Sequence, residues 1–260
     1  MKDLLSEETL RSALGDCKEM KILVYPVCGS TNLEAKKLFA TGFHGTALVV
    51  AEEQTAGRGR QGRSFYSPAE SGVYFTLLRT TTEPLGSRVS LTCAASVAVM
   101  RAIRECTGRQ TQIKWVNDLL LDGRKVCGIL AEGVTSDENA LAIGVGINLR
   151  PAKFPPELAE IAGSLEDHNT PRAVLIAAAV RNLLAFSETP ETREWLPDYR
   201  AHSCLIGREI LFWKDGKPTP GTASGIDEDG GLIVKTGQGT EVLRTGEITV
   251  RTVDQPTNSE

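Results

Sequence analysis

The sequence lacks a long hydrophobic run and has few cysteines. Its longest apolar runs, near residues 94–100 and 174–180, are far shorter than the roughly 20 residues that a membrane-spanning helix needs. The six cysteines form no Cys-x-x-Cys pair, and none has a histidine at metal-ligand spacing. These absences argue against a membrane partner, a zinc site and a disulfide framework, and they favour a cytoplasmic protein in a reduced compartment.

An excess of charge of one sign is also absent. The formal net charge is -4, so nucleic acid or an anionic membrane could be the main partner only if the basic residues were concentrated in one place. Only residues 57–63 show such a concentration. With 41% hydrophobic residues in a chain of 260, the composition is globular, and the length favours one large domain with a small one.

Strand and helix patterns alternate through the first 200 or so residues. Continuous apolar runs predict strands at residues 21–27, 46–52, 72–79 and 141–149. Helical spacing predicts helices at residues 31–40, 87–106, 170–188 and 191–202. Thr31 and Glu34 have the spacing of a capping box at the start of the first helix.

The character of the sequence changes near residue 206. Short strand-like runs follow, separated by Asp215-Gly216 and by Asp229-Gly230-Gly231, which predicts a small antiparallel barrel. We therefore expect a large domain at residues 1–204, a small domain at residues 205–254 and a frayed tail at residues 255–260.

Residues 57–63, GRGRQGR, form a loop in which arginines alternate with glycines after a buried strand. The segment contains the G-x-G-x-x-G dinucleotide pattern and resembles a Walker loop, but no helix follows it and no lysine ends it. Glycines allow the backbone to fold closely around a ligand, and guanidinium groups suit phosphate or carboxylate. We expect a loop that a doubly anionic ligand orders; a solvated basic loop and a nucleic-acid contact are the alternatives.

Asp122-Gly123 predicts a two-residue hairpin turn between two strands, at residues 113–121 and 124–132. This turn would place Leu120 opposite Lys125 and Asp118 opposite Cys127, so that Asp118 and Lys125 become diagonal neighbours on one face. Charges in a largely buried segment need partners. Lys125 could bridge an anionic substrate while Asp118 holds Mg²⁺ or a proton, or the two could simply pair with each other. Gly128 would allow a ligand or backbone close to the strand.

Two shorter segments have both a structural and a functional interpretation. Residues 29–32, GSTN, could cap a helix or could present amides and hydroxyls to a polar ligand. Gly144 and Gly146 share one face of a strand, so something should pack flush against it. We expect none of the three histidines to sit near a catalytic nucleophile, which argues against a serine or cysteine hydrolase.

Together these segments resemble the biotin protein ligases in order and approximate spacing. The matching motifs are GSTN at 29–32, QxAGRGRQGR at 54–63, KWxND at 114–118, KVCGILxE at 125–132 and GxGIN at 144–148. The resemblance implies an α/β catalytic domain related to class II aminoacyl-tRNA synthetases, with a mixed β-sheet and flanking helices, followed by an SH3-like domain. It also implies an ATP-dependent ligase that forms biotinyl-5'-AMP and passes biotin to a lysine of a biotin carboxyl carrier protein.

The resemblance carries expected roles to particular residues. Lys125, Arg60 and Asp118 would be catalytic. The expected biotin contacts are Ser30, Thr31, Asn32, Gln54, Arg58, Gly59, Arg60, Lys125 and Gly128. The expected ATP or adenylate contacts are Arg58, Arg60, Arg63, Phe65, Asn117, Asp118 and Asn148, with Mg²⁺ at Asp118.

The sequence departs from the family pattern at two positions. Val116 stands where the family commonly has proline, and Phe65-Tyr66 stands where a Trp-aromatic pair is frequent. Only about 20 residues precede the first predicted strand, so we expect a catalytic form without the N-terminal DNA-binding domain of some relatives, and no DNA partner. A homodimer is a further expectation. A lipoate-type acyl ligase and a nucleic-acid-binding module are the competing functions.

Overall fold

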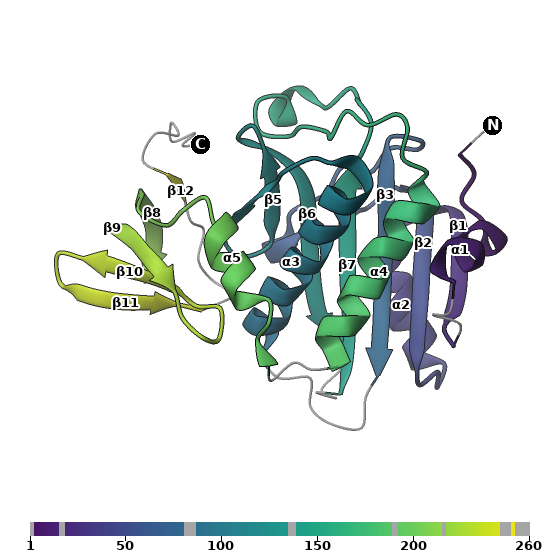
Figure 1. Ribbon diagram of the computed structural model, residues 1–260, viewed down its shortest axis with the longest axis horizontal. Coiled ribbons are helices and arrows are strands. Elements are labelled where there is room, and N and C mark those ends of the chain that lie inside the picture. The colour runs from purple at the N-terminus through teal and green to yellow at the C-terminus, as the bar shows by residue number, and fades with distance from the viewer. Residues whose placement is uncertain are drawn as a thin grey trace.

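Two β-sheets organise the chain, and they lie side by side in Figure 1. The computed structural model describes residues 3–15, 19–80, 87–134, 139–188, 192–214, 217–244 and 251–252. Within this part of the chain, no helix is long and apolar enough to cross a membrane.

The larger sheet has seven strands in the order β1-β2-β3-β7-β6-β5-β4. Their bounds are β1 (Lys21–Cys28), β2 (Thr46–Gln54), β3 (Gly72–Thr80), β4 (Gln112–Lys114), β5 (Asp118–Leu121), β6 (Arg124–Gly133) and β7 (Ala140–Asn148). Strands β1 and β2 are parallel, whereas the other neighbours are antiparallel. The sheet is therefore mixed, as expected.

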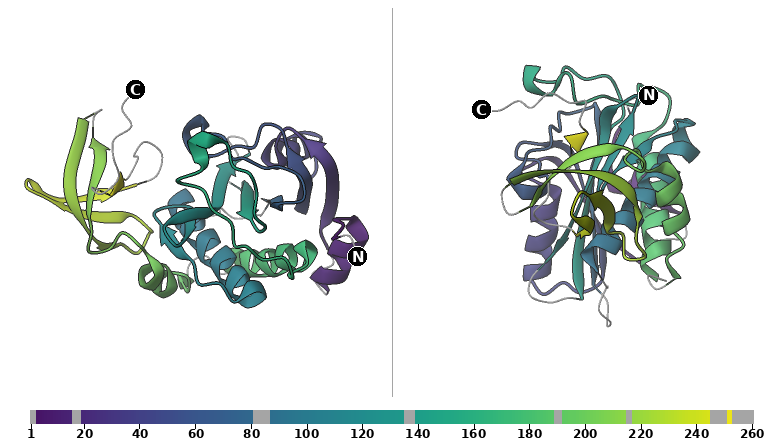
Figure 2. Two further views of the ribbon diagram at one scale, coloured as in Figure 1. Left: turned by 90° about the horizontal axis from the view of Figure 1, so that it is seen from above. Right: turned by 90° about the vertical axis from the view of Figure 1, so that its left-hand side faces the viewer.

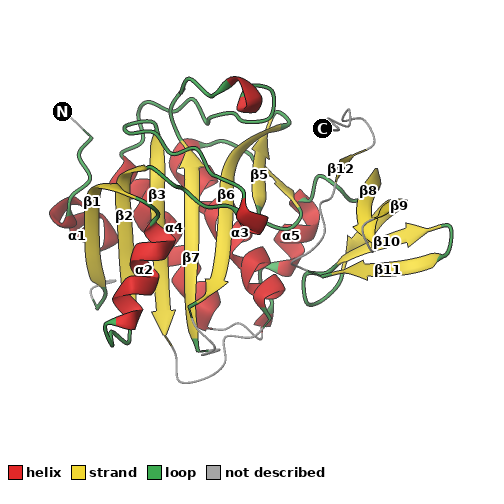
Figure 3. Cartoon of the chain, turned by 180° about the vertical axis from the view of Figure 1, so that it is seen from behind, coloured by secondary structure: helices red, strands yellow, loops and turns green. Residues whose placement is uncertain are grey.

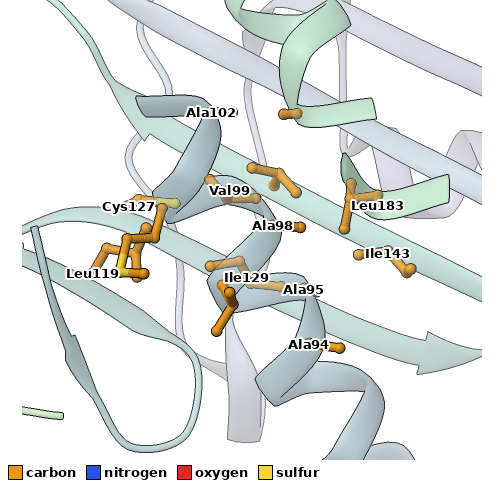
Figure 4. Packing of buried hydrophobic residues seen from close by; sticks show 14 of the residues in the cluster. Ala94, Ala95, Ala98, Val99, Ala102, Leu119, Cys127, Ile129, Ile143 and Leu183 are labelled. Atoms are coloured by element: carbon orange, nitrogen blue, oxygen red, sulfur yellow. The ribbon is translucent and has the colours of Figure 1, made fainter. Parts of the chain in front are cut away.

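Helices cover both faces of this sheet. Helices α1 (Glu7–Leu14), α3 (Arg88–Thr107) and α4 (Arg172–Glu188) lie on one face, and α2 (Thr31–Ala40) lies on the other (Figure 3). The alanines of α3 let its backbone come close to the sheet, where Ala95 and Ala98 face Ile129 and Ile143 (Figure 4). Ile129 is 1% exposed, and truncating such a side chain to alanine costs about 2–5 kcal/mol. The face under α2 carries a smaller apolar cluster of Ala35, Ala47, Val49 and Leu78, and polar side chains lie beside it.

Helix α1 and the segment before it were not predicted. Ser6 begins the helix with a capping box, in which its hydroxyl accepts from the amide of Thr9. Asp3 pairs with Arg172 at the start of α4, and Arg172 also pairs with Glu52 at 2.6 Å. Arg172 is 2% exposed, so its charge is buried within this ion network. Removal of one charged partner would lower the free energy of unfolding by several kcal/mol.

The predicted hairpin forms, but its register differs from the expected one. Asp122 and Gly123 both have positive φ, at 50° and 78°, which a two-residue turn of this type requires. Leu120 pairs with Lys125 as expected, but Asp118 pairs with Gly128 and not with Cys127. The register shifts because Val126, which is fully buried, is an extra residue in β6. Cys127 therefore turns to the core, and Gly128 shares a face with Asp118.

The run at residues 113–121 was expected to be one strand, but the structure divides it into β4 and β5. Residues 115–117 form a turn, and Lys114 pairs with Asp118 across it. Trp115 and Val116 are buried in this turn, at 5% and 0% exposure. Tertiary contacts of these two residues, described below, outweigh the local strand pattern.

The C-terminal part forms a separate antiparallel sheet with the order β11-β10-β9-β8-β12, beside α5 (Leu196–His202) (Figure 2). Its strands are β8 (Glu209–Lys214), β9 (Lys217–Ile226), β10 (Leu232–Thr236), β11 (Gly239–Leu243) and β12 (Arg251–Thr252). This arrangement agrees with the expected SH3-like domain. The division at residues 204 and 205 stays a prediction. The turn at Asp215-Gly216 and the tail at 255–260 lie outside the described residues.

Candidate functional site

The side chains singled out in the sequence come mainly from four places: the start of α2, the loop after β2, the β5–β6 hairpin and the end of β7. Helix α2 contacts β2, β3 and β7. The face of the sheet under α2 therefore carries the site, while α3 and α4 close the opposite face (Figures 1 and 3).

A chain of polar groups lies at the start of α2. Gln54 accepts hydrogen bonds from the backbone nitrogen and the hydroxyl of Thr31, at 2.9 and 3.1 Å, and donates to Ser67 at 2.9 Å. The Thr76 hydroxyl lies 2.8 Å from that of Thr31. Thr31 and Thr76 are 3% and 0% exposed, so their hydroxyls need the partners that this chain supplies.

Asn32 continues this chain toward β6. Its amide nitrogen donates to Glu132 at 2.9 Å and to the carbonyl of Leu130 at 3.3 Å, and its amide oxygen accepts from Thr76 at 2.6 Å. A Cβ on Gly144 would lie 2.1 Å from that oxygen, so the glycine makes room for Asn32. Both ends of the amide are used within the protein, which favours a positioning role over direct ligand contact.

The expected capping box at Thr31 and Glu34 is wrong. Ser30 is the N-cap residue of α2, with extended backbone, and no side-chain cap bond is present. The Thr31 hydroxyl joins the polar chain, and Glu34 pairs with Lys37 at 2.8 Å. Ser30 is 2% exposed and lies next to the polar chain in sequence. The Thr31 side chain at the start of α2 thus bonds within the site and does not cap the helix.

Lys125 and Asp118 form the charged centre of the hairpin. The Lys125 ammonium lies 2.8 Å from a carboxylate oxygen of Asp118, and the two side chains are 34% and 27% exposed. A Cβ on Gly128 would lie 3.1 Å from the ammonium, so the glycine gives Lys125 its space. The ammonium also lies 5.7 Å from the centre of the Phe65 ring. A partly exposed cation held in this way can meet an incoming anion.

Arg60 reaches the same hairpin from the arginine loop. Its guanidinium donates to Asn117 at 3.2 Å, while Asn117 donates to the carbonyl of Ile129 at 2.8 Å. Burial lowers the pKa of Arg60, and the nearby Asp118 carboxylate opposes this effect. Arg60, Asn117, Asp118 and Lys125 therefore gather at one place from two distant stretches of the sequence.

The other basic residues of the loop lie differently. Arg58 and Arg63 are exposed, and the loop is closed by a 2.7 Å bond from the amide of Gly59 to the carbonyl of Arg63. Among the described contacts, none joins Arg58 to Lys125. The positive charge of Arg58 contributes to the lowered pKa of the Glu132 carboxyl. Arg58 therefore acts electrostatically on the polar chain at the start of α2, to which Glu132 is bonded through Asn32.

Phe65 fills the glycine face of the sheet. A Cβ on Gly146 would lie 2.4 Å from the Phe65 ring, and one on Gly128 would lie 3.2 Å from it. The expectation that something packs flush against Gly144 and Gly146 is confirmed, since Asn32 and Phe65 do so. The adenylate contact expected of Phe65 stays a prediction.

Asn148 holds a segment that crosses the hairpin. Its amide nitrogen donates to the carbonyl of Gly163 at 2.9 Å. The same segment bonds Lys125 on both sides of its backbone, with the Lys125 amide donating to Ile161 at 2.8 Å and the Gly163 amide donating to Lys125 at 2.9 Å. Two backbone hydrogen bonds therefore hold Lys125 in place, and Asn148 on β7 anchors the segment that makes them.

Several supporting contacts were not predicted from the sequence. The indole of Trp115 donates to the carbonyl of Gly230 at 2.8 Å, and the carbonyl of Val116 accepts from Tyr199 at 3.1 Å and from Ser96 at 3.3 Å. These contacts hold the turn at residues 115–117 from behind. The Trp115–Val116 peptide bond is cis. Glu132 was part of a quoted motif but was given no role.

Comparisons with known proteins show the family to which the chain is similar. Residues 24–148 match the Biotin/lipoate A/B protein ligase family, and residues 205–251 match the Biotin protein ligase C terminal domain. The chain is 32% identical to the bifunctional ligase/repressor BirA of Bacillus subtilis, with 94% of this chain and 78% of that protein covered. It is 33% identical to the biotin--[acetyl-CoA-carboxylase] ligase of Paracoccus denitrificans, with 84% of this chain and 96% of that protein covered. The chain belongs to the biotin protein ligase family.

A solved structure supports the fold of this biotin protein ligase family member. The biotin protein ligase from Aquifex aeolicus, in complex with biotin and ATP, matches with a TM-score of 0.78 at 24% identity, over 90% of this chain and 99% of that one. The resemblance to biotin protein ligases and the two-part fold are therefore confirmed. The match of the C-terminal part favours biotin ligation over the lipoate and nucleic-acid alternatives.

Proposed function

We propose that this protein activates biotin with ATP and transfers it to one lysine of a biotin carboxyl carrier protein. The observation that carries the proposal is the gathering of Lys125, Asp118, Arg60 and Asn117 on the sheet face that also bears the polar chain of Thr31 and Gln54. Two cations beside a chain of neutral polar groups suit a substrate with a polar head and a carboxylate tail.

In this proposal the polar chain receives the head group of biotin. Ser30, Thr31 and Gln54 would contact it, with Asn32 fixed behind them and Arg58 and Gly59 closing the pocket from the loop. Gly128 would leave room for the acyl chain on its way to Lys125. A mostly preformed pocket with a few oriented polar groups is typical of small-molecule sites.

Adenylation would take place at the hairpin. An oxygen of the biotin carboxylate attacks the α-phosphorus of ATP, the new oxygen–phosphorus bond forms, the bond to the β-phosphate breaks and pyrophosphate leaves. Lys125 and Arg60 would lie where negative charge accumulates on the α-phosphate, and donors fixed there stabilise the transition state. Asn117 and Asn148 would contact the nucleotide, with Arg63 and Phe65 on the same side.

Transfer would use the same centre, with attack at the acyl carbon and AMP as the leaving group. The lysine amine of the carrier attacks the acyl carbon of biotinyl-5'-AMP, a nitrogen–carbon bond forms and AMP leaves with the oxygen of the broken bond. The amine must lose a proton in this step. Asp118 would accept it, because its carboxylate is partly exposed beside Lys125.

Mg²⁺ is part of the proposal as the ion that accompanies ATP. Among the described residues, no group of three or more His, Cys, Asp or Glu side chains could hold a metal ion. Mg²⁺ nevertheless binds through one or two carboxylates plus substrate phosphates and waters, and the Asp118 carboxylate fits that donor set. When bound, the ion would neutralise phosphate charge. Chelation with EDTA should then stop pyrophosphate release, and excess Mg²⁺ should restore it.

The carrier would belong to a biotin-dependent carboxylase, and we propose that both proteins meet in the cytoplasm. The described part of the chain offers no helix that could span a membrane. We further propose that the ligase forms a homodimer and does not bind DNA. Analytical ultracentrifugation and a DNA mobility-shift assay at low salt test these two points.

The function is tested by incubating the pure protein with biotin, ATP and a recombinant carrier domain, and by weighing the carrier with mass spectrometry. The proposal expects one biotinyl group on one lysine, dependent on both ATP and biotin. A carrier of unchanged mass, with a known biotin protein ligase modifying the same carrier in parallel, would contradict it.

A further inference from the structure

Glu132 lies at the end of the polar chain, on β6, away from the charged hairpin. One carboxylate oxygen accepts from the Asn32 amide at 2.9 Å, and the other lies 3.3 Å from the ammonium of Lys36. The side chain is 22% exposed, and none of the roles discussed above uses it. Its contacts run to Asn32, which is itself linked to Thr76 and Thr31.

The Glu132 carboxylate gives the chain of hydrogen bonds a direction, because it fixes which group donates and which accepts in each bond. An ionised carboxylate can only accept, so Asn32 must turn its amide nitrogen to Glu132 and its oxygen to Thr76. That oxygen also only accepts, and at 2.6 Å it takes the single hydroxyl hydrogen of Thr76. The amide orientation of Asn32 is therefore set by Glu132, through the shorter and charge-assisted bond, together with the carbonyl of Leu130, which accepts from the same nitrogen at 3.3 Å.

The direction continues to Thr31. With the Thr76 hydrogen committed to Asn32, the 2.8 Å contact between the two threonine hydroxyls has Thr31 as its donor, and the oxygen of Gln54 lies 3.1 Å away as a second acceptor. That Gln54 oxygen is fixed as well, because the backbone N–H of Thr31 donates to it at 2.9 Å. The Thr31 hydroxyl then has lone pairs, and no hydrogen, to offer a ligand. The complementary ligand group is an N–H, such as those of the ureido ring of biotin.

We infer that Glu132 is a positioning residue that, through Asn32 and Thr76, keeps the Thr31 hydroxyl as an acceptor and thereby selects a ligand ring that carries an N–H. The inference rests on the proposed function and adds a determinant of substrate selectivity to it. Glu132 acts without touching the ligand.

The ionisation of Glu132 is consistent with this role. Burial raises the pKa of its carboxyl, but the Asn32 amide and the Lys36 ammonium, with Arg58 beyond them, outweigh burial, and the net pKa is lowered. The group is therefore an acceptor throughout the neutral range. A neutral amide at this position could face Asn32 with either end, and only the longer bond to the carbonyl of Leu130 would then orient Asn32.

The test compares biotin with an analogue in which one ureido N–H is replaced by oxygen, using ligand-dependent exchange of pyrophosphate into ATP. The ratio of kcat/KM for biotin to that for the analogue is measured for the wild-type protein and for Glu132→Gln. Loss of one hydrogen-bond preference of about 1.4 kcal/mol predicts a roughly tenfold smaller ratio, mainly through a higher KM for biotin. Glu34→Gln is the matched control, because that carboxylate pairs with Lys37 and does not touch Asn32.

A second pair of variants keeps the Glu132 ion pair intact. Thr76→Val removes the hydroxyl that relays the direction, and Thr76→Ser keeps it. The inference expects Thr76→Val to reduce the ratio as Glu132→Gln does, with Thr76→Ser restoring it. Thermal unfolding of each variant checks that the fold is kept, and a merely structural role would lower activity with both ligands in the same proportion.

The outcomes separate the inference from the function on which it rests. If the wild-type protein exchanges pyrophosphate with biotin but Glu132→Gln and Thr76→Val keep the wild-type ratio, the inference is wrong and the proposed function stands. If the wild-type protein shows no biotin-dependent exchange, both fall. A reduced ratio in both variants, with Glu34→Gln and Thr76→Ser close to wild type, supports the inference.

Discussion

The indole nitrogen of Trp115 donates a 2.8 Å hydrogen bond to the carbonyl oxygen of Gly230. Trp115 precedes Asn117 and Asp118 in the large sheet, whereas Gly230 lies in the turn between β9 and β10 of the C-terminal sheet. Gly230 has φ +86°, and a Cβ there would lie 2.7 Å from the Cys93 sulfur, so the turn is packed tightly against α3. The C-terminal sheet therefore supports the nucleotide side of the proposed site from behind.

Replacing Trp115 with phenylalanine should weaken ATP use and leave biotin binding nearly unchanged. The variant removes one buried hydrogen bond, worth about 0.5–1.5 kcal/mol, and loosens the turn that carries Asn117. We expect the KM for ATP to rise up to about tenfold in pyrophosphate exchange. Trp213→Phe, on β8, is the matched control. Equal losses of ATP and biotin affinity in Trp115→Phe would argue against this local role.

Lys125→Ala should slow adenylation far more than it destabilises the fold. The ammonium is partly exposed, so its removal leaves Asp118 accessible to water, and we expect a small change in melting temperature. Loss of one fixed donor to a developing negative charge typically lowers kcat by about 10²–10³. Single-turnover formation of biotinyl-5'-AMP measures the effect. Normal turnover, or a loss of activity fully explained by unfolding, would remove Lys125 from the catalytic centre.

Biotin with ATP should protect the arginine loop from trypsin. Arg58 and Arg63 are exposed, and Gln61 has a positive φ of 55°, so the loop is accessible without ligand. An anion bound between Arg58, Arg60 and Lys125 would offset their mutual repulsion and order the segment. Cleavage after Arg109, which is exposed beyond α3, provides the internal control. If ligands left the cleavage rate after Arg58 and Arg63 unchanged, ordering of the loop by an anion would be ruled out.

The turn between β9 and β10 should make stability depend on pH through Asp227. Burial raises the pKa of this carboxyl, but the Arg244 guanidinium and the backbone amides of Gly231 and Asp229 outweigh burial and lower it. A pKa that is lower in the folded state adds stability above the ordinary carboxyl range, and that stability is lost as the pH falls through the folded-state pKa. Asp227→Asn should thus flatten the fall in unfolding free energy between about pH 5 and about pH 3, measured by urea titration. Glu241→Gln, on β11, is the control, and an unaltered fall in Asp227→Asn would be the contrary result.

Local chemistry was enough to predict most of the fold. The Asp122-Gly123 turn, helix α2 and the glycine face at Gly144 and Gly146 each follow from residue types a few positions apart. The register of the hairpin could not be predicted in the same way. It depends on burial of Val126 and on the two backbone bonds of Lys125, which donates to Ile161 and accepts from Gly163, and these partners come from a distant segment.

The site was predictable only in part for the same reason. Residue types singled out Lys125, Asp118 and the arginine loop as charged groups that need partners, and the resemblance suggested roles for them. The supporting bonds of Asn32 to Glu132 and of Trp115 to Gly230 span 100 and 115 residues, respectively. No pattern of neighbouring residues encodes such pairs, because they exist only after the strands and the C-terminal sheet have assembled.

The proposed function is tested most sharply by asking which acid drives release of pyrophosphate from ATP by the pure protein. The convergence of Arg60 and Lys125 beside the polar chain at Thr31 predicts release with biotin and little or none with lipoate or octanoate. It also predicts that biotin-dependent release is lost in Lys125→Ala. Release driven equally by lipoate, or release by wild-type protein that does not depend on any of these acids, would contradict it.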